Sequence, residues 1–289
     1  MSDKRPERHP PTPRRSRLRR LARAGWVPDQ HGAWPMALVP PVVGAVLGGV
    51  RPVHMLLVAA WIAAFLLFNA AGLWMRSPRR ARYRMAVRTW GVTTVVLGVG
   101  LLAWHPELLR WAPLFLPLVA VAIEEAWNRR ERSMASRLST VLASSLTCAV
   151  SAGLGGMPTL GRGWWPWRDA VTDPSTGWAR VWIVTALLTA YFVGTVPYVR
   201  SLIRGRGERR WVVASAVWHV VLVAGAGAAA HIGGVHWSVV VMGLVVFARA
   251  VVVPLDQSRR GPWPAVRIGM LEMVLCLLVA LAVVVPPAP

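Results

Sequence analysis

The chain alternates between long apolar runs and short clusters of arginine. Residues 52–75, for example, hold no acidic or basic side chain except His54. An α-helix rises about 1.5 Å per residue, so about 20 such residues cross the hydrocarbon core of a bilayer. Only 16% of the residues are charged, compared with about a quarter in a soluble domain. The pattern predicts a polytopic α-helical membrane protein rather than a β-barrel, which needs alternating segments of about ten residues.

Nine segments are apolar and long enough to be predicted as membrane spans. The residues before them, 1–30, are rich in arginine and proline, and we expect a disordered basic arm on the cytoplasmic side. The predicted organisation is therefore this arm followed by an all-α transmembrane helix bundle over 31–289. The predicted spans are 33–50, 53–75, 88–104, 108–126, 138–157, 178–199, 211–230, 235–253 and 267–286.

Basic residues alternate between the two sides that these spans define. With the N-terminus inside, 28 of the 33 Lys and Arg residues fall in inner segments and five in outer ones. Such a bias predicts an N-in, C-out topology in a bacterial cytoplasmic membrane. It also accounts for the net charge of +21 without nucleic acid, since the basic loops would face anionic lipids of the cytoplasmic leaflet.

A few polar side chains lie within or beside the predicted spans, where they are expensive and are candidates for function. They fall toward the predicted cytoplasmic half. Together they suggest a cavity that is open to the cytoplasm and suited to an anionic head group with an apolar tail. Two of them, Arg249 and Glu272, come from adjacent antiparallel spans and could instead neutralise each other in a structural role. The candidate ligand-binding residues are His31, Asn69, Arg200, Arg204, His219, Arg249 and Glu272.

Familiar catalytic motifs are absent from the sequence. It contains no Walker loop, HExxH, GxSxG or CxxC pattern. We therefore expect no metal and no cofactor, and whether the protein is an enzyme stays open. Gly44 and Gly48 form a GxxxG pair in the first span, which predicts close approach of another helix.

Several motifs resemble a known family. "QHGAWPMALVPPVVGAVLGG" at 30–49 resembles the opening signature of the YwiC-like family of bacterial membrane proteins. "GTVPYVRSLIRGRG" at 194–207 and "ERSMASRLSTVLASSL" at 131–146 are similar to further signatures, and the closing "ARAVVVPL…RIGMLEMVLCLL" also fits. The resemblance spans most of the chain after the arm. It implies a multi-pass membrane protein, and the family carries no assigned activity.

The predicted architecture is also distantly similar to UbiA-type intramembrane prenyltransferases. That family has nine helices, an inside N-terminus and aspartates that hold Mg²⁺ against a prenyl diphosphate. Here the corresponding places read "FNAAGLWMRSPRR" at 68–80 and "VPYVRSLIRGRG" at 196–207. Asn69 matches the Asn that opens the first motif, but Ala, Leu and Arg fill the Asp positions. The resemblance therefore implies a UbiA-like bundle without a Mg²⁺ site.

Three functions stay open at this point. The first is binding of an amphiphilic anionic lipid, such as an isoprenoid phosphate, in a cytoplasm-facing cavity. The second is small-molecule or proton-coupled transport that uses Glu272 and His219. The third is a structural or assembly role in a larger membrane complex.

Overall fold

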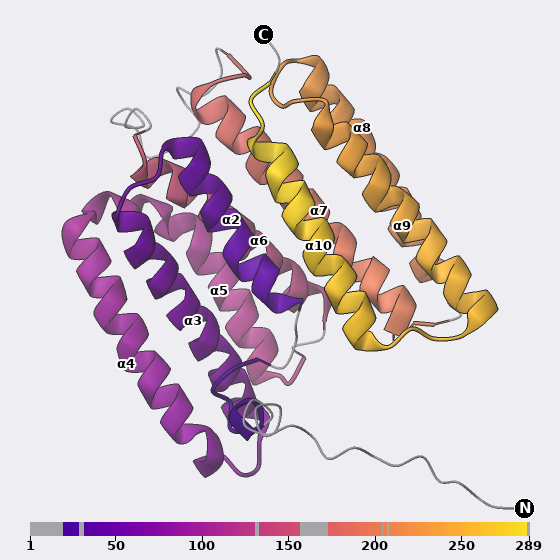
Figure 1. Ribbon diagram of the computed structural model, residues 1–289. Coiled ribbons are helices and arrows are strands. Elements are labelled where there is room, and N and C mark those ends of the chain that lie inside the picture. Colours follow the sequence, from indigo (N-terminus) through magenta and orange to yellow (C-terminus); the bar gives the residue numbers. More distant parts are fainter. Residues whose placement is uncertain are drawn as a thin grey trace, which may run out of the picture.

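The computed structural model describes residues 20–28, 32–130, 133–156, 173–203, 205–206 and 208–287. Within these ranges the chain is helical and has no strand, so the predicted all-α fold is confirmed (Figure 1). After one helical turn at 20–23, the elements are α2 (Ala33–Gly48), α3 (Val53–Arg76), α4 (Ala81–Trp104), the 3₁₀ helix η1 (Pro106–Trp111), α5 (Ala112–Trp127), α6 (Met134–Leu154), α7 (Gly177–Ile203), α8 (Arg209–His231), α9 (Ser238–Arg260) and α10 (Ala265–Val284).

Each of the nine predicted spans corresponds to one of these α-helices. Eight helical segments are long and apolar enough to cross a membrane: α3, α4, η1 with α5, and each helix from α6 to α10. The exception is α2, which is apolar but has only 16 residues. The chain is thus a multi-pass membrane protein. We call the end of the bundle where α3, α5, α7 and α9 finish the basic end, because the arginine clusters lie there.

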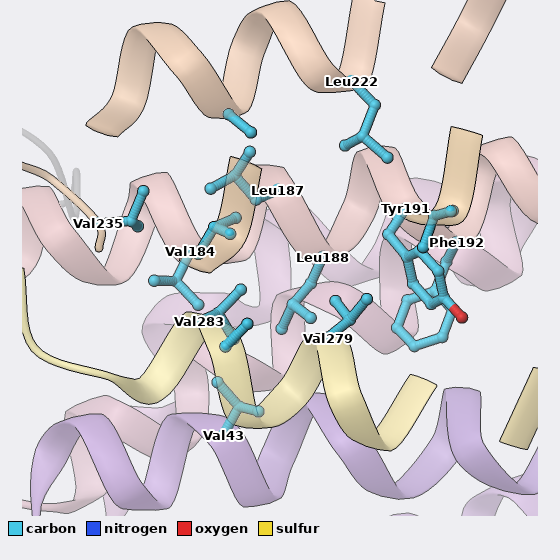
Figure 2. Packing of buried hydrophobic residues seen from close by; sticks show 14 of the residues in the cluster. Val43, Val184, Leu187, Leu188, Tyr191, Phe192, Leu222, Val235, Val279 and Val283 are labelled. Atoms are coloured by element: carbon cyan, nitrogen blue, oxygen red, sulfur yellow. The ribbon is translucent and has the colours of Figure 1, made fainter. Parts of the chain in front are cut away.

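The helices form two groups, α2–α6 and α7–α10, which lie side by side in Figure 1. In the first group α3 packs on α4, while α6 packs on α2 and α5. In the second group α8 packs between α7 and α9, and α10 packs on α9. Contacts of α6 with α7 and of α2 with α10 join the groups. At this junction Val43 of α2, Val184 of α7 and Val283 of α10 belong to one buried cluster (Figure 2).

Two adjacent prolines in the middle of α2 explain how this helix is fixed. Residues 40–41 lack backbone N–H groups, so the carbonyls of Met36 and Ala37 lose their usual partners within the helix. The Ser144 hydroxyl of α6 donates to the Met36 carbonyl, and Trp61 Nε1 of α3 donates to the Ala37 carbonyl at 2.9 Å. A bilayer supplies no water to such carbonyls. The prolines therefore tie α2 to both neighbouring helices.

The GxxxG pair of α2 sits directly against the backbone of α6. A methyl group at Gly44 would overlap the Cys148 carbonyl, and one at Gly48 would overlap backbone atoms of Ala152. Ser151 of α6 also donates to the Pro41 carbonyl at 2.6 Å. The close helix approach predicted from the sequence is confirmed.

Candidate functional site

Three of the predicted site residues meet in the interior of the α7–α10 group. They are His219 of α8, Arg249 of α9 and Glu272 of α10, and all three are buried. Arg249 Nη1 forms an ion pair with Glu272 Oε1, while Arg249 Nη2 lies 3.2 Å from His219 Nε2. Arg249 is 11 residues from the end of α9, or about 16 Å along the helix axis. Glu272 is seven residues from the start of α10, so the cluster lies inside the bundle, between its middle and its basic end.

The hydrogen bonds of His219 assign its tautomer. Its Nδ1 lies 2.6 Å from the carbonyl oxygen of Ser215, one turn earlier in α8, so Nδ1 carries a proton and donates it. Its Nε2 faces an Arg249 N–H, which can only donate, so Nε2 is the acceptor. His219 is thus a neutral imidazole that holds the guanidinium in place.

A fourth side chain, Tyr198 of α7, completes the cluster. The Arg249 Cζ lies 3.8 Å from the centre of the Tyr198 ring, within the range of a cation–π interaction. Each helix from α7 to α10 therefore contributes one residue. Tyr198 was not among the residues predicted from the sequence, because an aromatic residue inside a span is usually a packing residue. Its place in the "GTVPYVR" motif was the available signal.

Gly194 allows α7 and α8 to approach each other beside this cluster. A Cβ at Gly194 would lie 2.7 Å from Trp218 Cδ1 and 3.4 Å from His219 Cε1. Trp218 Nε1 donates to the Ala190 carbonyl at 2.7 Å, which fixes α8 against α7. The glycine that opens the 194–207 motif is therefore required for the position of His219.

Two polar atoms of the cluster have no hydrogen-bond partner in the part of the chain that the structure describes. They are Glu272 Oε2 and the Tyr198 hydroxyl, and both are buried. A buried polar group without a partner costs about 1–3 kcal/mol. The site thus holds one free acceptor and one free hydroxyl on side chains that contact Arg249.

An apolar cleft begins next to the cluster, on the side away from the basic end. It is a partly open depression, in which the space between the side chains and the open space at its mouth together amount to about 330 Å³. Two of its lining residues lie one turn from the cluster, since Leu222 follows His219 by three positions and Val246 precedes Arg249 by three. A charged centre and an apolar cleft are therefore contiguous. The cleft is lined by Leu187, Tyr191, Leu222, Ala226, Val239, Met242, Gly243, Val246, Val279, Ala282 and Val283.

On the other side, toward the basic end, an apolar layer covers the cluster. Leu202, Val253 and Ile268 form this layer with the ring of Tyr198. One turn beyond Val253, Gln257 is only 6% exposed, and neither atom of its amide has a partner among the described residues. The sequence predicted a cavity that opens to the cytoplasm. In this structure the apolar layer fills the space on the basic side, and the cleft lies on the opposite side of the cluster.

The other predicted residues lie elsewhere or outside the described ranges. Asn69 is in α3, which packs on helices of the first group, and its amide nitrogen is buried with no partner among the described atoms. Arg200 stacks on the ring of Trp211 with its Cζ 3.9 Å from the ring centre. His31 and Arg204 lie outside the described residues.

Comparison with known proteins confirms the resemblance to the YwiC-like family. A family model described as "YwiC-like protein" matches residues 27–152. "Uncharacterized protein YwiC" of Bacillus subtilis is 27% identical over 197 residues, which is 68% of this chain and 74% of that protein. An "Uncharacterized protein" of Haemophilus influenzae is 24% identical over 195 residues, again 68% of this chain and 74% of that protein. No solved structure matches the chain.

The family match and the polar cluster fall in different parts of the chain. The match covers α2 to α5 and nearly all of α6, whereas Tyr198, His219, Arg249 and Glu272 all lie beyond residue 152. Among the described residues, no three His, Cys, Asp or Glu side chains come together as a metal site. The similarity to UbiA-type enzymes stays a prediction.

Proposed function

Proceeding from its similarity to the YwiC-like family, we propose that this multi-pass membrane protein binds an amphiphilic anion in its α7–α10 group. The ligand class is a lipid of the isoprenoid-phosphate kind. Its head group is held at Arg249, and its tail lies in the apolar cleft. The observation that carries this proposal is the contiguity of a buried arginine, two unpartnered polar atoms and an apolar cleft.

The chemistry around Arg249 suits an anionic oxygen group. A guanidinium presents five N–H donors in a planar fork that matches phosphate and carboxylate oxygens. In the structure Glu272 takes one edge of this fork and His219 another, while Arg249 Nε makes only a long 3.4 Å contact with the Val246 carbonyl. The Glu272 carboxylate already binds the Arg249 guanidinium in the way that an external anion would. The Tyr198 hydroxyl can donate to a further ligand oxygen.

The cleft and the exterior of the bundle suit an apolar tail. Because the cleft is partly open, a chain longer than the cleft can continue into the bilayer. We place the protein in the bacterial cytoplasmic membrane, with the basic end toward the cytoplasm and anionic lipids as its partners there. Entry of a head group from the cytoplasm would require the layer of Leu202, Val253 and Ile268 to separate.

The first test is whether the purified protein retains the proposed lipid. The full chain, purified in mild detergent, is expected to retain an anionic lipid with a long apolar chain at a level above that of the source membrane. Lipid extraction and mass spectrometry measure this enrichment. If the bound lipids match the bulk membrane in composition, the proposal is wrong.

Two substitutions in α8 test whether the lipid tail lies in the cleft. Ala226→Leu places a larger side chain in the cleft, where Ala226 is 1% exposed. An added side chain in a space that the lipid tail occupies costs about 1–3 kcal/mol of binding free energy. We therefore expect a loss of bound lipid of about fivefold or more in the same extraction. Ala228→Leu lies on the exposed face of the same helix and is the control. Equal lipid content in the two variants would contradict the assignment of the tail to the cleft.

Proton-coupled transport is the second candidate function. The observation in its favour is the buried carboxylate of Glu272, which the apolar layer covers toward the basic end and which has the partly open cleft on its other side. We expect a pH gradient to drive uptake of decanesulfonate, a simple amphiphilic anion, into proteoliposomes if this function holds. Binding without gradient-driven uptake would leave the protein a lipid binder. If both fail, an assembly role is favoured.

A further inference from the structure

We propose that Glu272 is an internal anion that occupies Arg249 in the empty site, and that each external anion bound there brings one proton onto the Glu272 carboxylate. This inference rests on the proposed function and concerns the regulation of that site. It makes the protein an anion-binding protein whose affinity is coupled to the proton concentration.

The two oxygens of the Glu272 carboxylate have different surroundings. Oε1 makes the ion pair with Arg249, whereas Oε2 has no partner within the described part of the chain. A carboxylate that is retained only to neutralise a buried arginine usually has both oxygens hydrogen-bonded. Oε2 is therefore the position in the cluster where a proton can add without breaking a hydrogen bond.

Charge balance in the cluster calls for a proton when an anion binds. With a positive Arg249, a negative Glu272 and a neutral His219, the cluster has no net charge. A bound anion would add one negative charge at a buried place, and an uncompensated buried charge costs several kcal/mol. One proton from solvent restores neutrality when it bonds to Oε2. Glu272 then becomes a neutral acid, its ion pair with Arg249 is replaced by the external anion, and the new O–H can donate to that anion.

The other titratable groups that face Glu272 cannot take up this proton. From α7 these are Tyr191 and Tyr198, and from α10 it is Cys276, one turn away. All three are acids that already carry their protons and cannot take up another at ordinary pH.

His219 of α8 is the remaining base near the carboxylate. Its Nδ1 already donates to the Ser215 carbonyl, and its Nε2 accepts from Arg249. A proton on Nε2 would place two donors face to face. Glu272 is therefore the proton acceptor that the geometry allows.

The coupling can be measured on the full chain in lipid nanodiscs. The probe is decanesulfonate, whose charge stays at −1 over the whole pH range used. Calorimetric titrations in two buffers of different ionisation enthalpy give the number of protons taken up with each bound anion. We expect about one proton per anion near pH 7, and an affinity that falls about tenfold for each unit of rising pH.

Glu272→Gln removes the internal anion and keeps the shape of the side chain. This variant is expected to bind the probe more tightly than the wild type near pH 7, without proton uptake and without pH dependence. Glu125→Gln is the matched control, since Glu125 forms another Arg–Glu pair, with Arg130 at 3.2 Å, in the first helix group. We expect this control to keep the proton uptake of the wild type.

The outcomes separate the two proposals. Probe binding by the wild type without proton uptake would overturn the role of Glu272 and leave the binding function intact. Proton uptake that persists in Glu272→Gln would also overturn it. Absence of probe binding at every pH, together with no lipid enrichment after purification, would overturn the binding function itself. The wild-type proton count keeps the test decisive even if the variant does not fold.

Discussion

Arg249→Met is expected to lower the stability of the protein by about 3 kcal/mol, because it leaves the buried carboxylate of Glu272 without its counter-charge. The same change removes the cation that stacks on Tyr198 and the donor that His219 accepts. The expected fall in Tm is about 10 °C. Thermal unfolding of the detergent-solubilised chain, followed by tryptophan fluorescence, measures it.

The double variant Arg249→Met/Glu272→Met is expected to unfold within about 1 kcal/mol of the wild type, since an apolar pair of similar volume can replace a buried ion pair. Arg130→Met is the control for a single lost arginine, because its side chain is 60% exposed and its pair with Glu125 should contribute less than about 1 kcal/mol. A double variant as unstable as Arg249→Met would contradict the ion-pair explanation.

The double variant also separates structure from function. A purely structural ion pair predicts that the double variant keeps every property of the wild type. The proposed head-group site predicts instead that it folds but loses its enriched lipid. This distinction matters because a buried ion pair is weak evidence of stabilisation by itself. A stable double variant that retains its lipid would place the binding site away from Arg249.

The helical architecture could be predicted from the sequence because it depends on local properties. Run length and the absence of charge define a span whatever the neighbouring helices are. The arginine clusters likewise mark the ends of spans, and the described helices begin and end beside them. The span predicted over 33–50 was two residues longer than α2, which ends at Gly48.

The assembly of the site depends on which helices pack together, and that information is not local. Arg249 and Glu272 were paired correctly because a short loop makes their spans antiparallel neighbours. Asn69 was grouped with them because it lies toward the same end of a span and matches the Asn of a UbiA-type motif. In the structure α3 packs on α4 in the other helix group, so a shared depth does not bring Asn69 to the cluster.

Two residues in or near the cluster could not be recognised as candidates from the sequence. Tyr198 and Gln257 have ordinary explanations in a sequence, as a core aromatic residue and as a polar residue near a helix end. Only burial and missing partners single them out, since the Tyr198 hydroxyl and both atoms of the Gln257 amide have no partner in the described ranges. Orphaned hydrogen-bonding atoms are a property of the packed bundle and have no counterpart in residue spacing.

The signature at 30–49 has a largely structural explanation. Its adjacent prolines, 40 and 41, free carbonyls that Trp61 and Ser144 satisfy, and its GxxxG glycines allow α2 to touch the α6 backbone. The signature at 194–207 differs, because Gly194 and Tyr198 within it shape the polar cluster. If the proposed function holds, we assign the matched region 27–152 chiefly to the scaffold and ligand binding to the later helices.

This assignment predicts a large effect on stability from a single methyl group in the scaffold. Gly44→Ala is expected to destabilise the protein by about 3 kcal/mol or more, because the added Cβ would overlap the Cys148 carbonyl and neither backbone can yield cheaply. Separating α2 from α6 would also strain the hydrogen bond from Ser144 to the Met36 carbonyl. Thermal unfolding again provides the measurement.

Gly98→Ala is the matched control for this change. Gly98 lies within α4, and a Cβ there would meet no atom within 4 Å. Because alanine is the better helix former, this control should leave Tm unchanged or raise it slightly. The two variants add the same methyl group to the same kind of helix interior, so the difference between their Tm values measures the helix contact alone. Equal Tm values would show that the close approach of α2 to α6 contributes little to the stability of the protein.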